Sequence, residues 1–223
     1  MLKAQKKLTR KQIKQDKFVT FYFKSQEFLT QHSKTILYAI GGVILVSLII
    51  FVVKSKVAEN EQNAMVELTK AKQRYFAADY EGVLPVLQNL IDTYSGSDGA
   101  DEGLYYLANS YYFLKNYTEA QKYFEQFLDT GYSGILEASA IAGVAACHEE
   151  QGEYEDAARQ YGQAAAQFGD SFMAPQYLFN SARCYALSGK SDDALKALTN
   201  LIEKYADSAL KPDAEILLSE LTS

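Results

Sequence analysis

Residues 104–128 have the sequence LYYLANSYYFLKNYTEAQKYFEQFL, and this stretch decides the fold. Apolar residues recur every three or four positions on both sides of the central LKNY, which predicts two amphipathic helices joined by a tight turn. Equivalent positions then return every 37 residues along the chain. One set of equivalent positions holds small residues: Ala71, Ala108, Ala145, Ala182 and Ser219. A second column holds mostly small residues: Val83, Ala120, Ala157 and Ala194. A third column is bulky: Leu87, Phe124, Tyr161 and Leu198. A fixed period of about 34 to 47 residues is typical of stacked helical repeats, so we expect an all-α stack that presents surfaces to other proteins.

The 37-residue register predicts a repeat domain over residues 64–223. Its blocks start at Ala64, Asp101, Ala138 and Pro175, and a last helix from Pro212 is expected to cover the open end of the stack. The turns AADYEG, LKNYTEA, QGEYEDA and SGKSDDA place polar or glycine breakers before a capping residue of each second helix. The first block is the least regular, because Glu67 and Arg74 stand at positions where the pattern expects apolar residues.

An apolar segment precedes the repeats. Residues 35–53, TILYAIGGVILVSLIIFVV, carry no charge. As a helix with a rise of about 1.5 Å per residue they would span roughly 28 Å, close to the ~30 Å hydrocarbon core of a bilayer. The 34 preceding residues are long for a signal peptide, and lysines occupy the place of a cleavage site. We therefore predict an uncleaved transmembrane helix, followed by a helical linker over residues 54–63.

Charge is divided across this segment. Residues 1–34 hold nine Lys or Arg and two acidic residues, a net charge of +7, whereas residues 54–223 have a net charge of −13. The positive-inside rule places residues 1–34 in the cytoplasm and the repeats outside it, which in a Gram-negative bacterium is the periplasm of a single-pass inner-membrane protein. The acidic repeat domain argues against nucleic-acid binding. The N-terminal lysines could contact ribosomal RNA or anionic lipid, although topology determination alone is the simpler interpretation. Part of this segment is expected to form an interfacial helix, with aromatic residues in the headgroup layer: Phe18, Phe21, Tyr22, Phe23 and Phe28.

The repeats resemble a known family. In the block from Asp101, the places of the tetratricopeptide-repeat pattern are held by Leu104, Leu107, Ala108, Tyr111, Ala120 and Phe124. The following blocks supply Ile141, Val144, Ala145, His148, Ala157 and Tyr161, and then Leu178, Ser181, Ala182, Tyr185, Ala194 and Leu198. This resemblance implies a right-handed α-solenoid.

The whole architecture is similar to the YfgM family of ancillary SecYEG translocon subunits. A short basic N-terminus, one transmembrane helix and repeats of 37 residues are shared, and the stretch from Tyr154 to Ser208 is particularly similar to Bacteroidetes-type members. The resemblance implies a periplasmic scaffold that coordinates exported proteins with chaperones, with translocon subunits, chaperones or exported chains as partners. The alternative is an envelope scaffold for outer-membrane assembly or cell-wall machinery. Self-association through a repeat end or the long helix after Val53 is also open.

If the repeats bind a peptide, the concave groove lined by their first helices is the expected place. The matching positions are Tyr105, Asn109, Tyr112, Phe113, Gln176, Phe179 and Arg183. Tyrosine and arginine are good anchors because they combine a large contact area with a polar end, and Arg183 could pair with a partner carboxylate. The alternative is that these are ordinary packing and surface residues.

No chemistry stands out in the remaining residues, so neither an enzyme nor a cofactor is predicted. Cys147 and Cys184 lie one repeat apart, which places them too far from each other for a disulfide and predicts buried free thiols. His148 is expected to pack between helices, and no His/Cys cluster has metal-ligand spacing. Gly189-Lys190-Ser191 lies on a repeat turn without the leading glycine of a phosphate loop. The acidic run of Glu149, Glu150, Glu153, Glu155 and Asp156 is expected to be a solvated turn, with contact to a basic partner as the alternative.

Overall fold

The fold is entirely helical over the part of the chain that the structure describes. The computed structural model describes the backbone of residues 10–223 and the side chains of residues 17–223, and these contain ten α-helices and no strand. The predicted contribution of Lys3, Lys6 and Lys7 to the basic segment lies outside the described residues. The chain divides into two compact units, Met1–Val57 and Ala58–Ser223. The predicted all-α class is confirmed.

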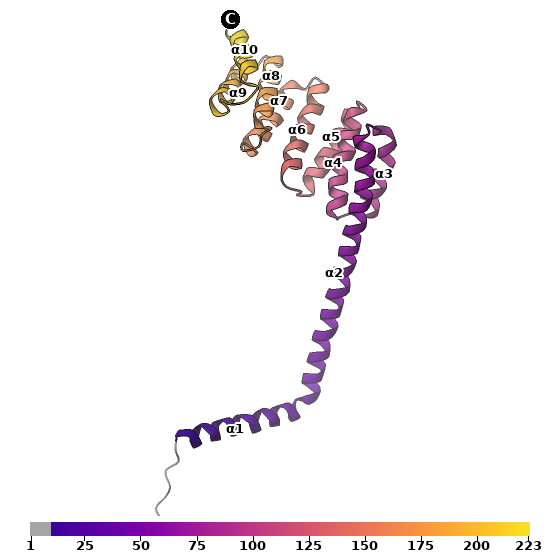
Figure 1. Ribbon diagram of the computed structural model, residues 1–223, viewed down its shortest axis with the longest axis vertical. Helices are drawn as coiled ribbons and strands as arrows, with labels where there is room; N and C mark the ends of the chain where they lie inside the picture. Colours follow the sequence, from indigo (N-terminus) through magenta and orange to yellow (C-terminus); the bar gives the residue numbers. More distant parts are fainter. Residues whose placement is uncertain (1–9) are drawn as a thin grey trace, which may run out of the picture. The chain divides into compact units, whose positions relative to one another are not determined.

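The first unit holds α1 (Arg10–Gln31) and the beginning of α2 (Ser33–Phe76) (Figure 1). The two helices are separated at His32, whose backbone N–H donates to the carbonyl of Phe28 at 3.0 Å. Among the described residues, α2 is the one helix long and apolar enough to cross a membrane, by its length and composition. Its apolar window has no buried residue within the structure, and the helix contains the whole segment predicted to span the bilayer.

The second unit stacks helices in chain order (Figure 1). The C-terminal part of α2 is followed by α3 (Tyr80–Thr93), α4 (Asp98–Phe113), α5 (Tyr117–Asp129), α6 (Ile135–Glu150), α7 (Tyr154–Gln167), α8 (Ala174–Leu187), α9 (Ser191–Lys204) and α10 (Lys211–Thr222). From α3 onward each helix packs chiefly on its neighbours in sequence, and α4 also touches α6. Contacts between α4 and α6 show that first helices of successive repeats lie side by side.

The 37-residue columns form the core of this stack. Ala71, Ala108, Ala145 and Ala182 are fully buried, as are all four residues of the second column. The bulky column is buried too, with exposed fractions between 0% and 5%. Small residues thus allow close helix approach while large ones fill the space between pairs. Ser219 departs from this prediction because it is exposed on α10, the last helix of the chain given, where no following helix covers it.

The turns between paired helices share one left-handed residue at an equivalent position. Ala78, Lys115, Gly152 and Gly189 follow one another at the 37-residue spacing, and each has a left-handed φ, between 59° and 81°. A residue in this conformation ends a helix by satisfying its last carbonyls: Asn116 N–H donates to Tyr111 O and Glu153 N–H to His148 O, both at 2.9 Å. Side chains then cap α3 and α5, as Asn116 does by accepting from the N–H of Glu119 at 3.3 Å. The predicted side-chain caps of α7 and α9 are absent, because Glu153 and Lys190 at these N-cap positions make no capping hydrogen bond.

Candidate partner-binding surface

The seven predicted groove residues lie on two first helices of repeats. Tyr105, Asn109, Tyr112 and Phe113 belong to α4, and Gln176, Phe179 and Arg183 belong to α8. Helix α6, the first helix of the repeat between them, supplies Ala142 and Ala146 at the positions equivalent to Phe179 and Arg183. Six of the seven are half-buried, and Phe113 is exposed.

On α4 the side chains are divided between packing and exposure. The ring of Tyr105 packs against Phe124 and Phe127, with centroids 6.0 and 5.7 Å apart, and burial raises the pKa of its hydroxyl. The amide of Asn109 donates to the carbonyl of Tyr105 at 2.8 Å. Tyr105 therefore contributes to the core, which favours the packing interpretation for this residue. Whether it also contacts a partner stays a prediction.

Aromatic rings gather at the C-terminal end of α4. Phe113 stacks on Tyr80 with centroids 4.6 Å apart, and Tyr112 meets Tyr117 edge to face at 5.4 Å. Burial, with a smaller contribution from the Glu150 carboxylate, raises the pKa of Tyr112 to about 12. Phe113 remains 50% exposed, so the cluster offers an apolar face next to a tyrosine that stays protonated at neutral pH.

On α8 the predicted anchor is already paired. Arg183 Nη2 donates to Glu149 Oε1 at 2.6 Å, which joins α8 to α6. The other carboxylate oxygen of Glu149 accepts from the Tyr161 hydroxyl at 3.4 Å and from the Cys184 thiol at 3.5 Å. Arg183, a candidate for pairing with a partner's carboxylate, pairs in the structure with a carboxylate of its own chain. Gln176 likewise donates to Asn180 at 3.0 Å within α8.

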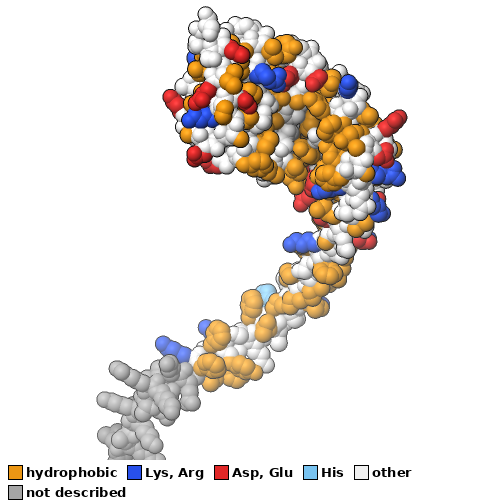
Figure 2. All heavy atoms as spheres, turned by 45° about the horizontal axis from the view of Figure 1, so that its top comes forward, with side chains coloured by type: hydrophobic (Ala, Val, Ile, Leu, Met, Phe, Trp, Pro, Cys, Tyr) orange, Lys and Arg blue, Asp and Glu red, His pale blue; other side chains and the backbone are white. Residues whose placement is uncertain are grey.

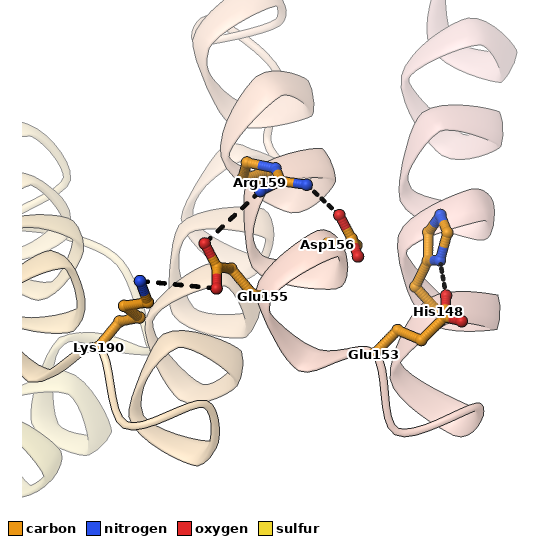
Figure 3. Close-up of polar contacts among 6 residues, drawn as sticks. All are labelled: His148, Glu153, Glu155, Asp156, Arg159 and Lys190. Atoms are coloured by element: carbon orange, nitrogen blue, oxygen red, sulfur yellow. Dashed lines mark hydrogen bonds and ion pairs between the residues drawn. The ribbon is translucent and has the colours of Figure 1, made fainter.

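Apart from the half-buried Glu149, the acidic run is largely solvent-exposed, as predicted for a solvated turn, and most of its carboxylates also have partners within the chain (Figure 3). Glu153 lies 2.5 Å from His148 Nδ1, and Glu155 lies 3.6 Å from Lys190. Arg159 bonds Asp156 and lies 3.6 Å from the other oxygen of Glu155. These exposed pairs reduce the net negative potential of the run, which weakens the case for a basic partner there.

The first repeat contains a groove that was not predicted from the sequence. It has a volume of about 370 Å³ and is lined by Met65, Leu68, Thr69, Lys72, Gln73, Phe76 and Glu102. Leu68, Lys72 and Phe76 stand one repeat before Tyr105, Asn109 and Phe113, so the same 37-residue spacing could have found them. The two irregular residues of this block have local partners: Glu67 pairs with Lys70 at 2.7 Å, and Arg74 donates to the Gly82 carbonyl at 3.3 Å.

The groove combines apolar walls with one ion pair. Lys72 Nζ lies 2.7 Å from Glu102 Oε1 and 5.1 Å from the centre of the Tyr106 ring. Phe76 is 71% exposed at one end of the groove. In the space-filling view, orange apolar side chains gather on the repeat unit and blue and red ones lie beside them (Figure 2). A hollow of this composition suits an apolar side chain held next to polar backbone groups.

A sequence model of the tetratricopeptide repeat matches two overlapping stretches, residues 105–172 and 148–209. Together the two stretches cover residues 105–209, which are similar to tetratricopeptide repeats. Repeats of this family indicate a protein–protein interaction scaffold, and their fold is typically non-enzymatic.

Solved structures show the same fold. Nearly identical tetratricopeptide-like repeats from Podosopora anserina share 13% identity and a TM-score of 0.59, over 72% of this chain and 86% of that one. YrrB, a tetratricopeptide-repeat protein with an unusual peptide-binding site, shares 18% identity and a TM-score of 0.57, over 75% and 80%. MamA from Desulfovibrio magneticus RS-1 shares 12% identity and a TM-score of 0.56, over 71% and 90%. No curated protein matches the chain.

The tetratricopeptide repeats hold both cysteines as buried free thiols. Burial raises the pKa of Cys147 and of Cys184 to about 12, with the carboxylates of Glu125 and Glu149 respectively adding to the effect. Neutral, shielded thiols are poor nucleophiles. Among the residues whose side chains are described, no group of three or more His, Cys, Asp or Glu could hold a metal ion.

Proposed function

We propose that this chain is a single-pass membrane protein whose tetratricopeptide repeats hold extended segments of other proteins. The observation that supports it most is the alignment of equivalent positions on first helices: Leu68 with Tyr105 and Phe179, Lys72 with Asn109 and Arg183, Phe76 with Phe113. On α2 and on α4 the three positions thus combine an apolar or aromatic residue, a hydrogen-bonding or charged residue and an exposed ring, and on α8 the third position is the exposed Leu187. An extended peptide needs this combination, because its side chains alternate with backbone groups that seek hydrogen bonds.

Binding is expected to begin in the groove of the first repeat. Met65, Leu68 and Phe76 give it apolar walls, and the Lys72–Glu102 pair offers both a donor and an acceptor. The exposed Phe113 lies one repeat further along the same set of positions. YrrB, which has this fold, carries a peptide-binding site, so the fold is able to present one.

The apolar run of α2 and the +7 charge of residues 1–34 support a membrane anchor with the repeats in the periplasm. The resemblance to the YfgM family supports a role as an ancillary translocon subunit, which coordinates exported proteins with periplasmic chaperones.

In-cell photocrosslinking tests this proposal. Photoreactive residues are placed at Phe76 and Tyr112 on the proposed surface, at Ser47 in the apolar run, and at the exposed Thr199 on α9 as a control. Translocon subunits at Ser47, together with exported chains or chaperones at positions 76 and 112 but not 199, are the expected products. Outer-membrane assembly or cell-wall proteins would instead favour the alternative envelope scaffold, and equal labelling at 199 would overturn the groove.

A matched pair of variants separates binding from folding. Phe76→Ala removes an exposed ring of the groove, whereas Phe172→Ala removes a similarly exposed ring, 78%, on the connection between α7 and α8. We expect Phe76→Ala to reduce crosslinking at position 112 several-fold and Phe172→Ala to leave it unchanged, with equal protein levels. Equal effects of the two variants would contradict the proposed site.

A further inference from the structure

Helix α1 has an apolar stripe that the proposed binding function does not use. The stripe lies on one face of the helix because its residues follow the helical period of 3.6 residues per turn. It consists of Phe18, Phe21, Tyr22, Phe28 and Leu29. Their exposed fractions run from 54% to 74%. The stripe reaches the end of the helix, where the ring of Phe28 stacks on His32 with centroids 4.5 Å apart.

Basic residues border this stripe. Lys17 and Lys24 are seven residues apart, so they share one side of the helix, next to the position of Phe28. Thr20, Glu27 and Gln31 lie on the side away from the stripe. Phe23, which was expected in the headgroup layer with the other aromatic residues, also lies on that side and is outside the stripe. Apolar rings on one face with lysines at its edge are typical of helices that lie in the plane of a membrane surface.

We propose that α1 lies on the bilayer surface, with its aromatic stripe in the headgroup layer and its lysines paired with anionic phospholipid headgroups. This inference rests on the proposed membrane anchor, because the stripe ends at Leu29, two positions before the last residue of α1, Gln31, and α2 begins at Ser33. A helix so close to a membrane span has the bilayer surface within reach, and a net charge of +7 in residues 1–34 is complementary to anionic lipid. The lysines thus act in lipid binding as well as in topology.

A lipid surface fits the stripe better than RNA or a second protein. Phenylalanine and leucine at helical spacing favour a continuous apolar phase, whereas RNA would need the cations to lie on the contact face itself. Here the lysines flank the stripe and do not interrupt it between Phe18 and Leu29, where Ser25 is its one polar position.

The chain offers a clean probe because it contains no tryptophan. The full chain is reconstituted into nanodiscs as three single variants: Phe21→Trp in the stripe, Thr20→Trp on the opposite side, and Val46→Trp in the apolar run of α2. Each is measured with lipids brominated near the headgroup end of the acyl chain, with and without phosphatidylglycerol in phosphatidylcholine. Bromine quenches a tryptophan only at close range, so it reports which residues meet the lipid.

We expect several-fold stronger quenching, and a bluer emission, at position 21 than at position 20. The difference should grow when phosphatidylglycerol is present and shrink in the Lys17→Gln/Lys24→Gln background or at high salt. Equal quenching at positions 20 and 21 would overturn the surface placement, and so would a blue-shifted but unquenched residue 21, which indicates burial against protein. A difference insensitive to phosphatidylglycerol would overturn the headgroup pairing. Strong quenching of Val46→Trp shows independently that α2 is inserted, and its absence would refute the anchor itself.

Discussion

Arg183 on α8 and Glu149 on α6 form an ion pair of 2.6 Å that bridges two repeats. The side chain of Glu149 is 19% exposed and that of Arg183 is 39% exposed, so the carboxylate is the more buried partner. The Tyr161 hydroxyl and the Cys184 thiol also point to Glu149. This polar centre ties α6, α7 and α8 together.

Removing the arginine is predicted to cost more than removing the carboxylate charge. Arg183→Gln leaves a shielded carboxylate without its cation, and we expect it to lower the free energy of unfolding by about 1–2 kcal/mol. Glu149→Gln leaves an arginine that can reach water, and we expect a loss of about 0.5–1 kcal/mol. Urea unfolding of the full chain in detergent, followed by near-UV circular dichroism, measures both.

The exposed pair of Lys190 and Glu155 is the control for the variants of Arg183 and Glu149. It is 3.6 Å long, with side chains 50% and 48% exposed, so Lys190→Gln should change stability by no more than about 0.5 kcal/mol. The double variant of Glu149 and Arg183 should be less destabilised than the sum of its singles. Strict additivity would show that the two side chains do not interact in solution.

The buried thiols predict a loss of stability at alkaline pH. The pKa values of Cys147 and Cys184 rise from 9.0 to about 12 on folding, so the unfolded chain releases these protons first. The stabilisation is complete below pH 9 and is lost as pH rises towards 12. Between pH 8 and pH 10 we expect the two thiols together to reduce the free energy of unfolding by on the order of 1–3 kcal/mol.

Serine is the matched replacement for this test. The equivalent position on α4 is Ser110, which is fully buried and donates to the Tyr106 carbonyl at 2.7 Å. A Cys147→Ser/Cys184→Ser variant does not titrate in this range, so its stability should fall less steeply between pH 8 and pH 10. Parallel slopes for the variant and the parent would sink the explanation.

A close helix approach makes Gly143 sensitive to a single methyl group. A Cβ added there would lie 2.5 Å from the ring of Phe124. Alanine is the better helix former by about 1 kcal/mol, yet we expect Gly143→Ala to reduce stability by a net ~1–3 kcal/mol because the ring must move. One repeat earlier, Leu87 stands at the position of Phe124 and Tyr106 at the position of Gly143. There the larger Tyr106 is accommodated by a smaller residue, Leu87, in place of phenylalanine. Phe124→Leu should therefore relieve the cost of Gly143→Ala, and a sum of the two single losses in the double variant would refute the contact.

The periodic part of the fold could be predicted from sequence, because size recurs with position. Ala108 and Phe124 return as Ala145 and Tyr161, so their burial follows from one register. The Glu149–Arg183 pair could not be predicted in this way, since Tyr112 occupies the position of Glu149 in the preceding repeat and leaves no recurrence to detect. An ion pair between repeats depends on how the stack rotates, which the period of the sequence does not specify.

The candidate surface was predicted only in part for a related reason. Residues on α4 and α8 follow from their spacing, whereas the groove at Leu68 and Phe76 lies in the first block, where Glu67 and Arg74 break the apolar pattern. These two side chains pair or hydrogen-bond locally, so the irregularity does not disturb the packing of the first repeat. The positions of the residues in the first repeat therefore follow from the 37-residue register, and less from the local pattern of apolar residues.

A glycine substitution in the turn between α4 and α5 is predicted to increase the stability of the fold. Lys115 has a φ of 61° at the position that Gly152 and Gly189 occupy in the next two repeats. A left-handed conformation costs a side-chain-bearing residue about 1–2 kcal/mol, while glycine adds entropy to the unfolded chain. We expect Lys115→Gly to raise the free energy of unfolding by about 0.5–1 kcal/mol and Gly152→Ala, its reverse, to lower it by about 1 kcal/mol. Urea unfolding of both variants checks the pair. A gain at 115 without a loss at 152 would point to the lysine charge as the cause, which Lys115→Gln then isolates, whereas opposite changes at the two positions follow only from the shared backbone conformation.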